Sequence, residues 1–211
     1  MYALSLPQQL LEHKMTQPKL FLDMDNVLVD TLSVLNEIDM RQQSVEKPDQ
    51  IPGIFRDLPP MPGAIEAVKQ LATEYDIYVL STAPWQNPSA WQDKLIWLQH
   101  YFGEDNTSPI YKRIILAHDK SVAHFGGGIL VDDRPYHGAS DWDDPDADSI
   151  WVQFGADPRL TWSNELVSFL LDVSQVQDVT DTLREAVAVV AERGHFYVHG
   201  DKTEFDKAHW E

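Results

Sequence analysis

The sequence contains no cysteine among its 211 residues. Disulfide bridges, thiolate catalysis and zinc–sulfur sites are therefore excluded. Basic residues are also scarce: 16 Lys and Arg stand against 34 Asp and Glu, which gives a formal net charge of −18 at pH 7. Nucleic acids and anionic membranes are bound through clustered cations, so a chain this acidic is expected to bind neither.

Long apolar runs are missing as well. No stretch approaches the roughly 18 apolar residues that cross a bilayer. Residues 1–11 lack the basic start and the continuous apolar segment of a signal peptide. These absences favour a cytoplasmic protein. What is present is an ordinary globular composition, 43% hydrophobic and 24% charged, in a chain long enough for one domain with a small insert.

Short apolar runs alternate with segments of helical periodicity. Buried strands are predicted at residues 19–24, 77–80, 111–117, 129–131 and 149–154. Helices are predicted between them and after the last of them. This alternation predicts an α/β fold, a Rossmann-like parallel sheet with helices on both faces.

The helices are placed by periodicity and by start signals. Periodicity predicts helices over residues 30–40 and 64–75. Start signals predict three more, at Asn87 with Pro88, at Ser163, and at Ser174 with Gln177, the last helix ending at Gly194. The helix after Pro88 has a predicted apolar face of Trp91, Leu95 and Leu98.

The chain divides into a core and two extensions. Interpretable patterns begin at residue 19, so residues 1–18 are predicted to be an N-terminal extension, with Met15 as an alternative start. Residues 19–173 form the predicted core, which carries an irregular insert at about 31–60 because four prolines fall within its second half. Residues 174–211 are a predicted C-terminal helical extension. Its apolar stripe packs either on the core or on a second subunit, so a homodimer is one alternative.

Polar side chains follow four of the predicted strands, at the point where each strand ends. In an open α/β sheet, ligands bind beyond the carboxyl ends of the strands. The coincidence of four such positions therefore indicates one functional centre, formed by Asp23, Asp25, Ser81, Thr82, Lys120, Asp132 and Asp133.

The carboxylates in this group suit a metal ion. Asp23 and Asp25 lie two residues apart at a strand end and point to one side, where they repel unless a cation lies between them. Asp132 and Asp133 close a buried strand, which is costly without a counter-ion. Each pair alone could be an ordinary acidic turn. Together they would form an all-oxygen site suited to Mg²⁺, and Lys120 beside a bound phosphate would balance the negative charge.

The order of these acidic residues along the chain narrows the class of protein. The acidic pair of two-component receiver domains comes early, whereas here the D-x-D segment comes first and the acidic pair last. That order, with the strand LFLDMDNVLVD, resembles the haloacid dehalogenase superfamily of phosphohydrolases. The segments GIFRDLPPMPGAIEAV, LSTAPWQNPSAWQDKLIWLQHYFG and RIILAHDKSVAHFGGGILVDDRP are similar to the 5′(3′)-deoxyribonucleotidase (cytosolic C-type) family, over about residues 19–171.

The resemblance implies roles for these residues in the hydrolysis of a nucleoside monophosphate. Asp23 would be the nucleophile that forms an aspartyl-phosphate, and Asp25 the general acid and base. Mg²⁺ would be held by the Asp23 carboxylate, the Asp25 carbonyl and Asp133, with Asp132 in support. The phosphoryl oxygens would be held by Thr82, with Ser81 beside it, and by Lys120. Phe55, in the GIFRDL segment, either stacks on the base or packs in the core.

Three departures from the family pattern leave the substrate open. Asn26 stands where the family usually has Gly, and His118 stands where Arg is expected. The insert is much shorter than the cap of the animal enzymes, so a small reduced cap is predicted. The alternatives are a phosphatase for another small phosphorylated metabolite, or a non-catalytic interaction protein that keeps the fold. The aspartate-rich run over residues 141–148 lacks the spacing of a calcium loop and is predicted to be solvated.

Overall fold

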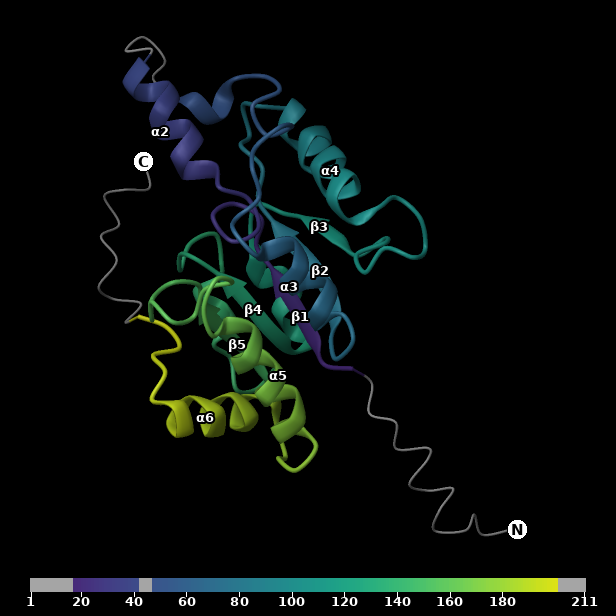
Figure 1. Ribbon diagram of the computed structural model, residues 1–211, viewed down its shortest axis with the longest axis vertical. Helices are drawn as coiled ribbons and strands as arrows, with labels where there is room; N and C mark the ends of the chain where they lie inside the picture. Colours follow the sequence, from purple (N-terminus) through teal and green to yellow (C-terminus); the bar gives the residue numbers. More distant parts are fainter. Residues whose placement is uncertain (1–16, 42–46, 201–211) are drawn as a thin grey trace.

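The computed structural model describes residues 17–41 and 47–200 (Figure 1). Met15, nearly all of the predicted N-terminal extension, part of the predicted insert and the end of the C-terminal extension lie outside these residues. Among the described helices, none combines the length and the apolarity that crossing a membrane requires.

A parallel sheet of five strands forms the centre of the described residues, in the order β3-β2-β1-β4-β5. The strands are β1 (Lys19–Leu22), β2 (Asp76–Ser81), β3 (Ile114–Leu116), β4 (Gly128–Asp132) and β5 (Ser149–Gln153). The chain leaves β1 toward β2 and β3, then returns to β4 on the other side of β1. The carboxyl ends of β1 and β4 are therefore the topological switch point, where α/β sheets bind ligands.

Helices cover both faces of this sheet, which confirms the predicted α/β fold. One face packs against α3 (Ala64–Leu71), α4 (Ser89–Phe102), α5 (Leu166–Gln177) and α6 (Leu183–Gly194). The other face, with Phe21 and Trp151, is covered around Trp142 by two short 3₁₀ helices, η2 (Lys120–Gly126) and η3 (Ser140–Trp142). The helix α2 (Thr31–Arg41) and the 3₁₀ helix η1 (Pro48–Gln50) belong to the insert and lie beyond the carboxyl edge of the sheet (Figure 1).

Two of the predicted helix starts were wrong, and a third was displaced by one residue and lacks the predicted side-chain cap. α4 begins at Ser89, and the Asn87 amide instead donates to the carbonyls of Asp49 and Ile51, at 2.9 and 3.1 Å. α5 begins at Leu166 rather than after Ser163. Ser174 lies inside α5, so its spacing to Gln177 marks no start. The same physical reason applies to all three. A side chain can cap a helix only where the backbone changes from a non-helical to a helical conformation, and packing decides where that change occurs.

The start of α6 is fixed by other residues. The Thr182 hydroxyl accepts a hydrogen bond from the Glu185 backbone amide at 3.1 Å, and α6 ends at Gly194 as predicted. The predicted boundary between residues 173 and 174 falls within α5, and the division into core and extension stays a prediction.

The aspartate-rich loop between β4 and β5 fastens α6 to the sheet. The Asp148 carboxylate accepts hydrogen bonds from the backbone amides of Leu183 and Arg184, at 3.0 and 3.1 Å. Asp143 forms an ion pair with the Arg184 guanidinium at 2.7 Å. Negative charge at the first turn of a helix is stabilising. The loop therefore has a structural role beyond the solvation that its composition predicted.

Candidate active site

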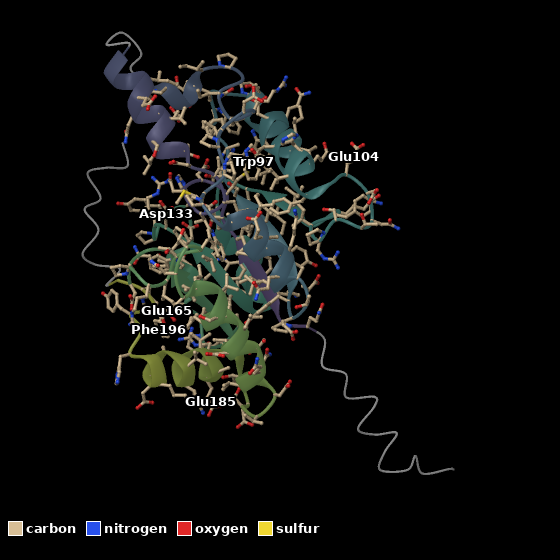
Figure 2. The ribbon with its side chains drawn as sticks, viewed as in Figure 1. Trp97, Glu104, Asp133, Glu165, Glu185 and Phe196 are labelled. Atoms are coloured by element: carbon tan, nitrogen blue, oxygen red, sulfur yellow. The ribbon has the colours of Figure 1, made fainter. Side chains whose placement is uncertain are left out.

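Three carboxylates meet where β1 and β4 end. Asp23 follows β1, and Asp132 and Asp133 lie at and just after the end of β4, because Leu22 and Val131 are register partners. One oxygen from each carboxylate lies within 4.8 Å of the others. The structure thus brings together three of the predicted site residues. Figure 2 shows Asp133 between the sheet and α2.

Three oxygens of this cluster accept hydrogen bonds from Lys120, the Arg134 backbone amide and Asn26, but two others accept none from the described part of the chain. Within the described residues, the buried Oδ1 atoms of Asp23 and Asp133 accept no hydrogen bond, although a cationic side chain lies near each. Burial, followed by repulsion from Asp23, raises the pKa of Asp132 to about 7. Burial also raises the pKa of Asp133 to about 6. Buried oxygens that repel one another and lack donors fit a hard divalent cation.

Lys120, the first residue of η2, places its ammonium beside the carboxylates of Asp23 and Asp132. Its side chain is buried, with Nζ 3.0 Å from Asp23 Oδ1 and hydrogen-bonded to Asp132. Burial alone would lower the pKa of the Lys120 ammonium, but Asp23 and Asp132 together raise it. Its backbone is held on both sides, since its amide donates to the His137 carbonyl at 2.6 Å and its carbonyl accepts from the Trp142 indole at 3.0 Å. The ammonium is therefore a fixed positive charge.

Asp25 is held separately from the three carboxylates. Its Oδ1 accepts a hydrogen bond from the Thr31 hydroxyl at 2.8 Å, and its Oδ2 lies 2.5 Å from the Lys94 ammonium. Burial raises the pKa of the Asp25 carboxyl, but the charge and hydrogen bond of Lys94, the Thr31 hydrogen bond and the charge of Lys120 together lower it overall. Asp25 is therefore ionised in the resting site.

Lys94 is a site residue that sequence analysis missed, because the predicted apolar face of its helix was right only at Leu98, which is buried. Trp91 and Leu95 are 39% and 41% exposed, whereas Ala90, Lys94 and Trp97 are buried. Residues three and four apart share one face of a helix. A lysine four residues after Ala90 and three before Trp97, inside that apolar stripe, is the signal that could have revealed it.

The Lys94 ammonium also holds the segment after β2. It donates to the Ser81 hydroxyl at 2.9 Å and to the Thr82 carbonyl at 2.5 Å, and it lies 5.2 Å from the centre of the Phe55 ring. Ser81 and Phe55 are buried, and Thr82 lines the neighbouring cleft. The structure therefore groups Ser81 and Phe55 around Lys94. Phe55 packs in the core and also contributes to the wall of the cleft.

Asn26 has a conformational and a bonding role. Its φ of 59° lies in the left-handed region, which favours Gly and is tolerated by Asn. This explains why an Asn can occupy the family's glycine position. The Asn26 amide donates to Asp133 Oδ2 at 3.2 Å, and its side-chain oxygen accepts from the Leu32 backbone amide at 3.0 Å. Asn26 thus joins the carboxylate cluster to the first turn of α2.

A cleft of about 570 Å³ opens beside Asp25. One wall comes from the insert and the other from the segments after β2, β3 and β4, with Leu32, Leu35, Asp49, Phe55, Thr82, Trp85, His118, Arg134 and His137 among the lining residues. The exposed His118 ring lies between two indoles, 5.2 Å from Trp85 and 5.7 Å from Trp91, measured between ring centres. His118 therefore borders the cleft together with Trp85.

Comparison with known proteins points to one family. The family model described as "5' nucleotidase, deoxy (Pyrimidine), cytosolic type C protein" matches residues 41–140. A protein of Vibrio phage KVP40 named "Putative 5'(3')-deoxyribonucleotidase" is 39% identical over 151 residues, which cover 71% of this chain and 82% of that protein. A Bordetella pertussis protein of the same name is 36% identical over 118 residues, and the match spans 54% of this chain and 60% of that protein.

Among solved structures, a haloacid dehalogenase-like hydrolase from Burkholderia xenovorans LB400 has a TM-score of 0.40 and 13% identity, covering 60% of this chain and 78% of that chain. That likeness is too remote to support an argument. The phage protein, by contrast, is similar over most of both chains. The chain belongs to the 5′(3′)-deoxyribonucleotidase (cytosolic type C) family, as the motifs predicted. It is accordingly an enzyme, a phosphoric monoester hydrolase of the nucleotidase type.

Proposed function

We propose that the enzyme dephosphorylates (deoxy)ribonucleoside 5′-monophosphates in a Mg²⁺-dependent reaction through an aspartyl-phosphate on Asp23. The observation that carries the proposal is the position of the Asp23 carboxylate. It is buried 3.0 Å from the Lys120 ammonium and lies in one cluster with Asp132 and Asp133, in which two buried oxygens accept no hydrogen bond from the residues that the structure describes. A nucleophile there has positive charge beside it, which an anionic substrate requires.

In the first step, an Asp23 carboxylate oxygen forms a bond to phosphorus while the ester P–O bond breaks in line with it. The electron pair of the broken bond goes to the nucleoside oxygen, which takes a proton from Asp25. The ion pair with Lys94 favours ionised Asp25 in the resting site. A phosphate dianion entering beside Asp25 opposes this by like-charge repulsion, so that the carboxyl becomes the proton carrier.

In the second step, water attacks the aspartyl-phosphate. Asp25, now ionised, takes a proton from that water as its oxygen bonds to phosphorus. The bond between phosphorus and Asp23 breaks, the Asp23 carboxylate is restored, and inorganic phosphate leaves. The pairing of Asp25 with Thr31 and Lys94 suits this step, since it holds the ionised carboxylate in place.

The residues that would hold Mg²⁺ are the Asp23 carboxylate, the Asp25 carbonyl and Asp133, with Asp132 supporting them. When bound, Mg²⁺ supplies charge compensation between the nucleophile and the phosphate. Lys120 and Thr82 hold the transferring phosphoryl oxygens. Ser81 and Phe55 act through Lys94, which ties the Thr82 carbonyl to Asp25.

The cleft supports a nucleotide as the substrate. Its volume of about 570 Å³ lies within the range of small-molecule sites. The cleft has charged groups near Asp25 and an apolar and aromatic wall that includes Leu35, Phe55 and Trp85. A nucleoside monophosphate likewise has a charged phosphate at one end and an aromatic base at the other. The related proteins carry the name of deoxyribonucleotidases.

Phosphate release from a panel of nucleoside monophosphates and sugar phosphates, with Mg²⁺ and with a chelator, tests the proposal. We expect Mg²⁺-dependent release that favours nucleotides in kcat/KM. Asp23→Asn should lower kcat by about a thousandfold or more, whereas Asp178→Asn, at the exposed end of α5, should leave it unchanged.

Each other result excludes one part of the proposal. Preference for a sugar phosphate would retain the chemistry and reject the substrate. Full activity of Asp23→Asn would reject the nucleophile. Mg²⁺ binding without turnover on any member of the panel would reject both the proposed substrate and the proposed role of Asp23.

A further inference from the structure

The segment after α6 returns to the sheet and lies against the outer edge of β5 (Figure 1, where it is drawn in yellow). The Gln153 backbone amide donates to the Val198 carbonyl at 2.7 Å. The Gly200 backbone amide donates to the side-chain oxygen of Gln153 at 2.8 Å. Residues 196–200 thus cover the end of the edge strand that lies nearest the carboxylate cluster.

This segment, residues 196–200, is firmly anchored. The Arg159 guanidinium donates to the carbonyls of Gly194 and His195, at 3.0 and 2.7 Å, and lies 4.3 Å from the centre of the Phe196 ring. The Asp157 carboxylate, which pairs with Arg159, accepts from the Tyr197 backbone amide at 3.1 Å. Figure 2 shows Phe196 on the same side of the molecule as Asp133. The position of the segment relative to β5 is therefore fixed independently of Gln153.

Two β5 side chains that residues 196–200 contact donate hydrogen bonds to the backbone carbonyls of Asp132 and Asp133. Trp151 and Gln153 are two residues apart and so lie on one face of the strand. The Trp151 indole donates to the Asp132 carbonyl at 3.1 Å, and the Gln153 amide donates to the Asp133 carbonyl at 3.1 Å. The His199 ring stacks on the Trp151 indole with 5.4 Å between ring centres and 13° between planes.

Gln153 is fixed because both ends of its amide are used. Its oxygen must accept from the Gly200 N–H, and its nitrogen must donate to the Asp133 carbonyl, so only one orientation of the amide satisfies both. The side chain is also largely buried, at 8% exposure. Without Gly200, the amide could turn and lose the Asp133 carbonyl.

We propose that residues 196–200 position the Asp132–Asp133 pair through Gln153 and thereby set the affinity of the site for Mg²⁺. The inference rests on the proposed function, which makes this pair part of the metal site. Residues that hydrogen-bond to the ligands of a metal, without contacting the metal themselves, typically change the affinity of the site for that metal by 10–100-fold. Gln153 is a positioning residue, because it contacts the ligand's backbone and neither substrate nor metal.

Replacing Gln153 by Met keeps the length of the side chain and removes both hydrogen bonds. We expect the Mg²⁺ dissociation constant, measured by titration calorimetry on the full chain, to rise about tenfold. The kcat should return to the wild-type value at saturating Mg²⁺, which a general folding defect would not allow. The matched control is Gln70→Met, an exposed change on α3 that should alter neither quantity.

A second pair of variants tests the segment without touching Gln153. Gly200→Pro removes the N–H that fixes the Gln153 amide, whereas Gly200→Ala keeps it. We expect weaker Mg²⁺ binding by a few-fold in Gly200→Pro and unchanged binding in Gly200→Ala. The two Gly200 variants also test the positioning role of residues 196–200 if Gln153→Met does not fold.

The possible results separate this inference from the function on which it rests. Wild-type Mg²⁺ affinity in folded Gln153→Met, or equal affinity in the two Gly200 variants, would overturn the positioning role while leaving the proposed function intact. A wild-type enzyme that binds no Mg²⁺ would overturn the proposed function and the inference together.

Discussion

Replacing Lys94 by Met removes a buried ammonium that joins three parts of the site. The ammonium lies 2.5 Å from Asp25 Oδ2, 2.9 Å from the Ser81 hydroxyl and 2.5 Å from the Thr82 carbonyl. Loss of one member of a buried ion pair costs about 3–5 kcal/mol, because the other charge stays buried and unpaired. Asp25 keeps the Thr31 hydrogen bond and 17% side-chain exposure, so we expect the lower end, about 3 kcal/mol at pH 7.

The loss in the free energy of unfolding caused by Lys94→Met should depend on pH. Burial raises the pKa of Asp25, but Lys94, with smaller effects of Thr31 and Lys120, lowers it overall, so the pair stabilises the fold while Asp25 is ionised. That contribution is lost as the pH falls through the folded-state pKa. In Lys94→Met the burial of Asp25 is opposed by fewer charges, and its carboxyl protonates more readily. The difference in the free energy of unfolding between variant and wild type should therefore shrink at about pH 4.

Urea unfolding at the two pH values measures this difference. The control is Lys69→Met, an exposed lysine on α3, which should change stability by less than about 0.5 kcal/mol. A Lys94→Met loss below about 1 kcal/mol at pH 7, or one that is the same at both pH values, would refute the view that Asp25 depends on this ammonium.

Two further predictions concern the metal and the sheet. Because burial raises the pKa of Asp132 to about 7 and that of Asp133 to about 6, these groups destabilise the metal-free fold as the pH rises from about 4 to about 8. Mg²⁺ should therefore raise Tm more at pH 8 than at pH 5, and equal shifts would contradict this. Gly128→Ala should cost more than about 2 kcal/mol in urea unfolding, since a Cβ would lie 2.8 Å from the Lys19 carbonyl oxygen at a φ of 123°. Gly53→Ala, also at positive φ but with nothing within 4 Å, should cost clearly less.

Features that depend on short stretches of chain could be predicted. Apolar runs of a few residues ended by polar ones gave the five strands, although the third is confined to Ile114–Leu116. Asp23 and the Asp132–Asp133 pair were found for the same reason, since a carboxylate that ends a buried run is conspicuous in the sequence alone. α6 ends at Gly194 as predicted, although the left-handed residue that closes the helix is His195, with a φ of 52°.

Features that depend on distant segments were missed or misread. The apolar side chains of Trp91 and Leu95 suggested the wrong buried face of α4, because exposure beside a cleft is decided by what packs nearby. Lys94 was missed with them. Its partners, Asp25 and Ser81, come from other elements, so no local pattern reports the pairing.

The sequence by itself determined which elements form and which chemical groups stand at their ends, because periodicity and strand length are local properties of a chain. The tertiary structure decided which of those ends meet. Only the strand order places β1 beside β4 and so brings Asp23 to Asp132 and Asp133. Only long-range packing buries Lys94 against Asp25 and returns residues 196–200 to β5, since such contacts depend on chain segments far apart in sequence.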